Sequence, residues 1–194
     1  FMEAISGCKD YNITISNEDG TTKTVTLLKK NESRNEVMLM EDVDFGGALF
    51  NPVVLPNIVT FHGNGHTISG VDYPMFSNLS GSVKELNLKD VEMEHKGEGK
   101  PSSDPNHDTA WGVLAHICDG GRISNVSLRN ASLDIMLHNK APDGTGQDKV
   151  YNVGALVGWV KSGTLSDITL VDAVSVTVEA EETEAAYISC VGGV

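Results

Sequence analysis

Short stretches of aliphatic residues alternate with polar residues over most of the chain and recur at a fixed spacing. Residues 121–131 align with residues 163–173 at an offset of 42, and residues 81–91 align with 121–131 at an offset of 40. Alternation at every second residue, interrupted by Gly, Asn and Asp, predicts β-strands joined by tight turns. A period of this length indicates stacked structural repeats, each of which buries its apolar side against its neighbours.

Three aliphatic positions recur in every copy and are expected to stack in columns inside the protein. These columns are Val83, Ile123 and Leu165; Leu86, Val126 and Ile168; and Leu88, Leu128 and Leu170. Two polar positions also recur, namely Glu85, Asn125 and Asp167, and then Asp90, Asn130 and Asp172. Short Asx side chains bond their own backbone, so the second polar position is predicted to be the corner between successive strands. Stacked columns require parallel strands about 4.8 Å apart.

A shorter apolar segment precedes each of these copies. Val113–Ile117 corresponds to Ala155–Trp159, and Met75–Leu79 is the earlier copy. A further copy begins at Val191-Gly192-Gly193-Val194, which matches Val153-Gly154-Ala155-Leu156 at an offset of 38. The sequence therefore predicts that the chain enters a new turn of the stack at Val191.

The first 58 residues are less regular, and three inserts interrupt the later repeats. Tyr11–Ser16 and Lys23–Leu28 alternate like two strands joined by the turn 17–20, which predicts a hairpin. Further strands are expected within 35–45 and 58–68. Because the end of a repeat stack exposes strand edges and apolar surface, residues 1–58 are interpreted as an irregular cap and 59–194 as the stacked coils. The polar inserts at 95–109, 139–149 and 179–184 are expected to be projecting surface loops.

Composition and charge narrow the possible partners. The 194 residues carry 14 Lys and Arg against 27 Asp and Glu, a formal net charge of −13, which argues against nucleic acid or an anionic membrane surface as partner. No apolar run approaches the roughly 20 residues that cross a bilayer, so no membrane insertion is expected within this chain. Cys8, Cys118 and Cys190 are too few and too widely spaced for a disulfide framework and are interpreted as buried thiols.

The segment Gly154–Trp159, followed by Ser162–Asp167, resembles the GLUG motif, a repeat of bacterial exported and surface proteins. Phe61–Gly70 and Leu39–Phe45 are similar to segments that commonly precede such repeats, so the resemblance extends over residues 37–194. It implies an all-β fold, a right-handed parallel β-helix, and a secreted or cell-surface location. The middle copy departs from the motif, since Ala115 and His116 stand where the clearer copy has Val157 and Gly158. Related repeats also occur in the non-catalytic regions of immunoglobulin A protease-like metallopeptidases.

Metal and cofactor sites are not expected. His62 and His66 have the spacing of a zinc-binding His-Glu-x-x-His motif, but the Glu is missing and Gly63 and Gly65 oppose a helix. A glycine turn between two strands explains this segment better. The loop 143–148 could wrap a calcium ion, but it has only two carboxylates and is interpreted as solvated. In the acidic group of Glu41, Asp42 and Asp44, alternation puts Asp42 and Asp44 on one face of a strand, but cation binding is not expected there.

Two tryptophans are the candidate ligand-binding residues. Trp111 and Trp159 lie near the start of adjacent repeats, where an exposed indole ring could stack on a sugar and a buried one would fill the core. Asp90 and Asp172 share a column and could form an acid/base pair, as in carbohydrate-active enzymes. Their turn positions already explain them, and Asn130 stands between them. No catalytic residue is therefore assigned.

The sequence as a whole is interpreted as one domain, residues 1–194, that is a fragment of a larger protein. We expect a non-enzymatic secreted or cell-surface module of a bacterium, an adhesion or ligand-binding scaffold for a host protein or glycan. The alternatives are a region of an immunoglobulin A protease-like peptidase or a carbohydrate-active lyase or hydrolase. The final strands are expected to lack cover, which favours end-to-end self-association or fraying after about Glu179.

Overall fold

The computed structural model describes residues 1–17, 19–48, 50–95, 110–137, 150–180 and 187–192. The described part is all-β apart from one five-residue helix, α1, Met2–Ser6. The strands of the N-terminal half are β1 (Tyr11–Ser16), β2 (Thr22–Asn31), β3 (Glu36–Leu39), β4 (Val43–Asp44), β5 (Val53–Leu55), β6 (Thr60–His62), β7 (Thr67–Ser69) and β8 (Phe76–Leu79). Those of the second half are β9 (Ser82–His95), β10 (Ala110–Trp111), β11 (Ala115–Leu137), β12 (Val150–Gly154), β13 (Val157–Ala180) and β14 (Tyr187–Gly192).

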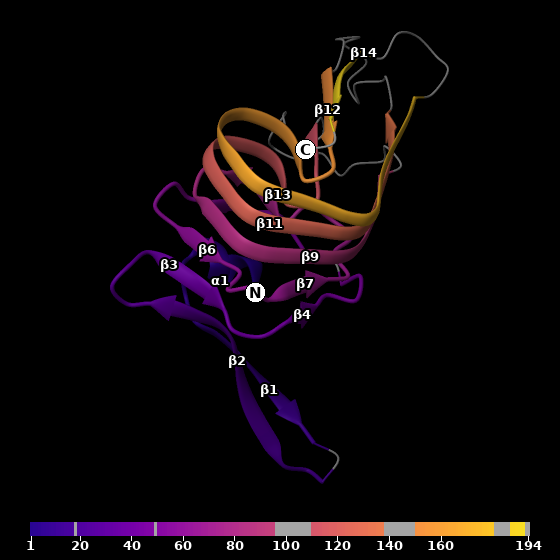
Figure 1. Cartoon of the computed structure of the whole chain (residues 1–194). Coiled ribbons are helices and arrows are strands. Elements are labelled where there is room, and N and C mark those ends of the chain that lie inside the picture. Colours follow the sequence, from indigo (N-terminus) through magenta and orange to yellow (C-terminus); the bar gives the residue numbers. More distant parts are fainter. Residues whose placement is uncertain (18, 49, 96–109, 138–149, 181–186, 193–194) are drawn as a thin grey trace, which may run out of the picture.

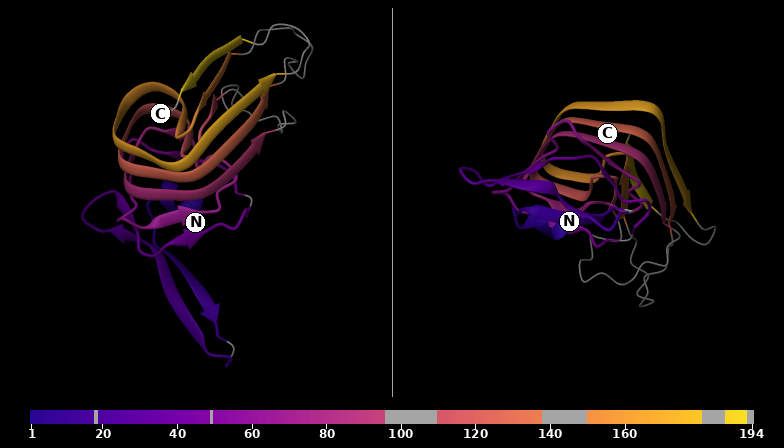
Figure 2. Two further views of the ribbon diagram at one scale, coloured as in Figure 1. Left: turned by 45° about the vertical axis from the view of Figure 1, so that its right-hand side comes forward. Right: turned by 90° about the horizontal axis from the view of Figure 1, so that it is seen from below.

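Three long strands, β9, β11 and β13, stack in parallel and in register. The three predicted columns are confirmed, because Ile123 pairs with both Val83 and Leu165, Val126 with both Leu86 and Ile168, and Leu128 with both Leu88 and Leu170. Figure 1 shows the three strands as curved ribbons lying one above the next, and from below they follow the same bent path (Figure 2). The apolar columns thus become the continuous interior of the stack.

The bends in these ribbons occur at the two recurring polar positions. Glu85, Asn125 and Asp167 have φ of 52°, 51° and 53°, and Asp90, Asn130 and Asp172 have φ of 52°, 50° and 61°. The second set was predicted to form the corners, and the structure shows that the first set forms corners too. A single left-handed residue redirects the strand and lets the next residue, such as Leu86 after Glu85, point inward again.

One additional residue shifts the register of β13. Arg129 pairs with Val171 but Ala131 pairs with Val174, so that Asp172 and Ala173 lie opposite Asn130. The sequence alignment, which placed Ala131 beside Ala173, is wrong at this point. The extra residue shifts the alternating pattern by one position, so that Val174, Val176 and Val178 pair with Ala131, Leu133 and Ile135.

Parallel pairing begins at Glu36, well before residue 59. β3 pairs with β6, β4 with β7 and β5 with β8, all in parallel, so the segment 36–55 belongs to the stack rather than to the cap. The predicted hairpin is confirmed: β1 and β2 are antiparallel, and β2 joins the stack by antiparallel pairing with β3. The main sheet is therefore mixed, and the hairpin projects away from the stack (Figure 1).

Helix α1 was not predicted. Met2 and Ile5 are buried, and the Ser6 hydroxyl donates a hydrogen bond to the Val54 carbonyl of β5 at 2.6 Å. The helix thus covers one side of the first turn of the stack.

A second, smaller sheet runs beside the main one. Its three strands are β10, β12 and β14, all parallel, and Val153 pairs with Val191 and Gly154 with Gly192. The predicted alignment of Val191-Gly192 with Val153-Gly154 is confirmed by this pairing.

Burial differs sharply between the middle and the last of the long strands. The column residues Ile123, Val126 and Leu128 of β11 are 1% exposed or less, whereas Leu170 of β13 is 38% exposed and its neighbours Leu165 and Ile168 are only half-buried. Cys118 is buried, and desolvation raises the pKa of its thiol; Cys8 is half-buried rather than buried. The side chain of Cys190 and most of the three predicted inserts lie outside the described residues. No helix in the described part is long and apolar enough to cross a membrane.

Candidate functional site

The outward face of β9, β11 and β13 beyond the second corner carries polar side chains in rows. Since every second residue points outward, Glu92, Ser132 and Ser175 form one row across the three strands, and Glu94, Asp134 and Thr177 form the next. We call this surface, residues 90–95, 130–136 and 173–179, the outer strip. The inward residues between the two rows are apolar: Met93 and Leu133 belong to the buried core, and Val176 packs against it.

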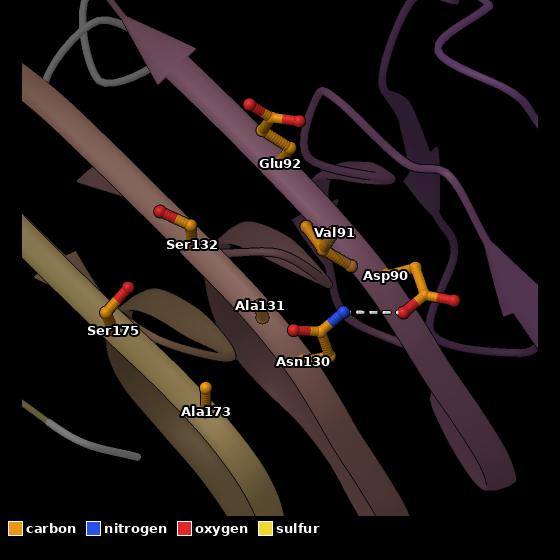
Figure 3. A pocket seen from close by; sticks show the side chains of 8 residues that line it. All are labelled: Asp90, Val91, Glu92, Asn130, Ala131, Ser132, Ala173 and Ser175. Carbon is orange, nitrogen blue, oxygen red and sulfur yellow. Dashed lines mark hydrogen bonds between the residues drawn. The ribbon is translucent and has the colours of Figure 1, made fainter.

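The first hollow in the outer strip lies at the second corner (Figure 3). It has a volume of about 280 Å³ and is lined by Asp90, Val91, Glu92, Asn130, Ala131, Ser132, Ala173 and Ser175. The side chains that line it on β11 and β13 are small, apart from Asn130, and Ala173 belongs to the bulge. Asp90 and Glu92 supply negative charge along its β9 side.

The carboxylate of Asp90 is held by neighbours on both sides. Asn130 Nδ2 donates to Asp90 Oδ1 at 2.7 Å, and Lys89 Nζ lies 3.0 Å from Oδ2. The hydrogen bond from Asn130, followed by that from Lys89, lowers the pKa of Asp90 below its ordinary value. Asp172 is displaced by the bulge and pairs instead with Arg129, Nη1 to Oδ2 at 3.3 Å. An ionised, hydrogen-bonded Asp90 is suited to accept hydrogen bonds and unsuited to donate a proton.

A second hollow of about 240 Å³ lies further along the same strip. Its lining is Glu94, His95, Asp134, Ile135, Met136, Thr177 and Glu179. Three carboxylates and a threonine hydroxyl offer hydrogen-bond acceptors, while Met136 and the His95 ring provide apolar contact area. Among the described residues that line the two hollows there is no Lys or Arg, so the charged side chains of both linings are mainly acidic.

Trp111 lies underneath this region rather than on the surface. Its side chain is 3% exposed and stacks on His95 with ring centroids 4.1 Å apart, while Tyr73 and His116 contact it edge-on at 5.4 and 5.2 Å. Its Nε1 is buried with no hydrogen-bond partner among the described residues. Trp111 therefore supports His95, one wall of the second hollow, from behind.

Trp159 is the more accessible of the two candidate tryptophans. It is 36% exposed, and Lys161 Nζ lies 4.5 Å from the centroid of its ring. Trp159 lies at the start of β13 in the main sheet, whereas Trp111 lies on β10 in the smaller sheet, so the structure places the two rings on different sheets. They are not two halves of one stacking platform.

His62 and His66 have separate acidic neighbours. His62 Nδ1 is 3.3 Å from Glu36 Oε1 and its Nε2 is 3.1 Å from Glu85 Oε2, although this second contact lacks hydrogen-bond geometry. His66 Nδ1 is 3.1 Å from Asp42 Oδ1. Asn64 and Gly65 between them have φ of 55° and 77°, as a tight turn requires.

Two carboxylates of the acidic group near residue 42 accept hydrogen bonds from backbone amides. Asp42 Oδ1 accepts a hydrogen bond from the Thr67 amide at 2.9 Å, and Asp44 Oδ1 accepts one from the Gly46 amide at 2.9 Å. Among the described residues, no group of three or more His, Cys, Asp or Glu side chains could hold a metal ion. The loop 143–148 lies outside the described residues.

Sequence reasoning did not single out the outer strip. Its signal was present, since Glu92, Ser132 and Ser175 each follow a corner residue by two or three positions and carry polar side chains. These rows can be recognised only when the bulge at Ala173 is known, because only then do the three residues align.

Comparison with known protein families, curated proteins and solved structures finds no match to this chain.

Proposed function

We propose that this chain is a right-handed parallel β-helix that acts as a non-enzymatic ligand-binding module, secreted or at the surface of a bacterium. The observation that carries the proposal is the outer strip, in which rows of polar side chains repeat across three in-register strands and enclose two adjacent hollows. Repeat stacks commonly bind through extended surfaces of this kind. The resemblance to GLUG-motif repeats supports the assignment of β-helix and location.

The chemistry of the strip favours a neutral or cationic ligand, such as an uncharged glycan or a basic segment of a host protein. Carboxylates and hydroxyls accept hydrogen bonds from sugar hydroxyls, and apolar surface from Met136 and His95 can contact the C–H face of a sugar ring. The net charge of −13 opposes sulfated or uronic acid-rich glycans.

The carbohydrate-active alternative, a lyase or hydrolase, would rest on Asp90 and Asp172. Asp90 is bonded to Asn130 and Lys89, and Asp172 to Arg129, so each carboxylate already has a structural partner. This favours binding over catalysis for the described surface.

The proposal is tested by screening neutral, sulfated and uronic acid-containing glycans, together with basic peptides, for binding and for turnover. A ligand of the strip should lose affinity at least tenfold in Ser175→Trp, which fills the first hollow. Thr24→Trp, a substitution of similar size on the exposed hairpin, should leave binding unchanged. Reproducible turnover that disappears in Asp90→Ala or Asp172→Ala would overturn the non-enzymatic assignment.

A further inference from the structure

The edge of β13 that faces away from β11 has no strand beside it among the described residues. β13 is 24 residues long, and its ladder in the described part runs to β11 alone. A row of backbone N–H and C=O groups is thereby left open on a long strand, which is a template for pairing with another strand.

The apolar column at this edge is incompletely covered. Leu170 is 38% exposed, whereas Leu128, the same position one turn below, is fully buried between Leu88 and Leu170. Val160 and Trp159, at the start of the same strand, are 42% and 36% exposed. The open backbone edge and the exposed apolar column lie on the same strand, so a single added strand would satisfy both.

We infer that this edge is an interaction surface for a parallel strand that carries the same repeat. The repeat has aliphatic residues at positions i, i+3 and i+5 and corner residues at i+2 and i+7, as in Leu165, Asp167, Ile168, Leu170 and Asp172. A parallel strand with this spacing follows both bends of β13 and places each aliphatic residue on the column below it, as β13 does on β11.

A second copy of the folded chain does not fit this edge by antiparallel pairing. To match both bends, it would have to place its Asp172 opposite Asp167, because the two corners are five residues apart. Ile168, which belongs to an inward column, would then lie opposite Val171, which pairs with the exposed Arg129 and points outward. Residues directly opposite in an antiparallel pair share one face, so the columns would not continue.

Head-to-tail stacking of two chains is also disfavoured. The opposite end of the stack is covered by β2, which pairs with β3, and by α1, which contacts β5. Two chains of net charge −13 repel each other as well. A strand that carries the repeat therefore fits this edge better than a second copy of the folded chain does.

The test extends the full chain with a copy of residues 157–192 placed directly after Val194. The matched control carries the same extension with two neighbouring pairs exchanged in the appended copy, Leu165 with Ser166 and Ile168 with Thr169. Composition and length are then identical, but in the control the Leu and Ile of these pairs point outward and the Ser and Thr point inward. Hydrogen exchange is measured for the original segment 163–172, and the segment 82–90 of β9 monitors whether the host remains folded.

We expect exchange in the original segment 163–172 to slow about tenfold or more in the matched extension and to remain unchanged in the control. In the matched extension, Leu170→Lys of the original β13 should abolish the slowing while the β9 segment stays protected. Unchanged exchange in the matched extension would overturn the inference, as would equal slowing in the control. Concentration-dependent slowing in the unextended chain, accompanied by dimer formation, would assign the edge to a second copy instead.

Discussion

Six residues other than glycine turn the three long strands through left-handed backbone conformations. Such a conformation costs about 1–2 kcal/mol for most residues, and Asn and Asp bear it best because their short side chains can bond locally. Five of the six corners are Asn or Asp, and Glu85, with φ of 52°, is the exception. Its carboxylate reaches His62 Nε2 at 3.1 Å, but half of the side chain is exposed, so this contact offsets little of the backbone cost.

Glu85→Asn should therefore be more stable than Glu85→Gln by about 0.5–1 kcal/mol. Both variants remove the charge and the contact with His62, but only Asn relieves the left-handed strain. Urea unfolding of the two proteins measures the difference. Equal stabilities would show that the corner at Glu85 carries no strain that its side chain can relieve.

Position 163 requires glycine both for its backbone conformation and for the close approach of the strand below. Gly163 has φ of +123°, and a Cβ there would lie 2.2 Å from the carbonyl oxygen of Gly121 on the strand below. Gly163→Ala should cost about 3 kcal/mol or more, because backbone strain and a clash between strands act together. Gly120→Ala is the matched control: it has φ of +82° with no atom within 4 Å, so it should lose only about 1 kcal/mol. Similar losses in thermal or urea unfolding would contradict the close approach.

At the scale of elements, the sequence predicted the columns but not the boundaries. The pattern of Ile123, Val126 and Leu128 was sufficient because burial of one face fixes strand register. It could not reveal that parallel pairing begins at Glu36, since β3 to β7 are two to four residues long and too short to repeat a pattern. Helix α1 is missed because five residues carry almost no periodic signal. The outer strip was missed because it depends on the bulge at Ala173.

The first strands of the stack are joined by a charged group that links stability to pH. Glu36 on β3 is 6% exposed, and its Oε1 lies 2.7 Å from Lys84 Nζ on β9 and 3.3 Å from His62 Nδ1 on β6. The hydrogen bond from Lys84 lowers the pKa of Glu36 in the folded protein, despite the opposing effect of desolvation. Folding then favours the ionised carboxylate.

A lowered folded pKa gives stability that is present above the unfolded pKa, about 4.3 for Glu, and is lost as the pH falls through the folded value. Glu36→Gln should therefore destabilise the protein at neutral pH, and its deficit relative to the unmodified chain should shrink as the pH falls below about 4. Glu41→Gln, at an exposed position, serves as the control and should show no such convergence. Urea unfolding between pH 3 and 7 measures the free energy of unfolding of each protein. If the stability that Glu36→Gln loses did not depend on pH, Glu36 would not be the group that links stability to pH.

At the scale of the whole molecule, stability is expected to depend on the neighbours that each turn of the stack possesses. A turn in the middle buries its aliphatic residues against strands on both sides, whereas β13 has β11 on one side alone in the described part. Burial follows this order, with Leu128 fully buried and Leu170 38% exposed in the same column. In a repeat stack, stability is approximately a sum of terms within each repeat and between neighbours.

Two identical substitutions in that column measure the neighbour terms. Leu128→Ala should cost about 2–5 kcal/mol, because it opens a cavity between β9 and β13 that the stack cannot collapse around. Leu170→Ala should cost less than about half as much, since its side chain already has solvent on one side and its removal leaves no enclosed cavity. Hydrogen exchange separates the effects further: Leu170→Ala should accelerate exchange in β13 and leave β9 unchanged, whereas Leu128→Ala should accelerate both. Equal losses of unfolding free energy in the two variants, with the same exchange pattern, would mean that the stack unfolds as one unit. The contribution of a column residue would then not depend on its position in the stack.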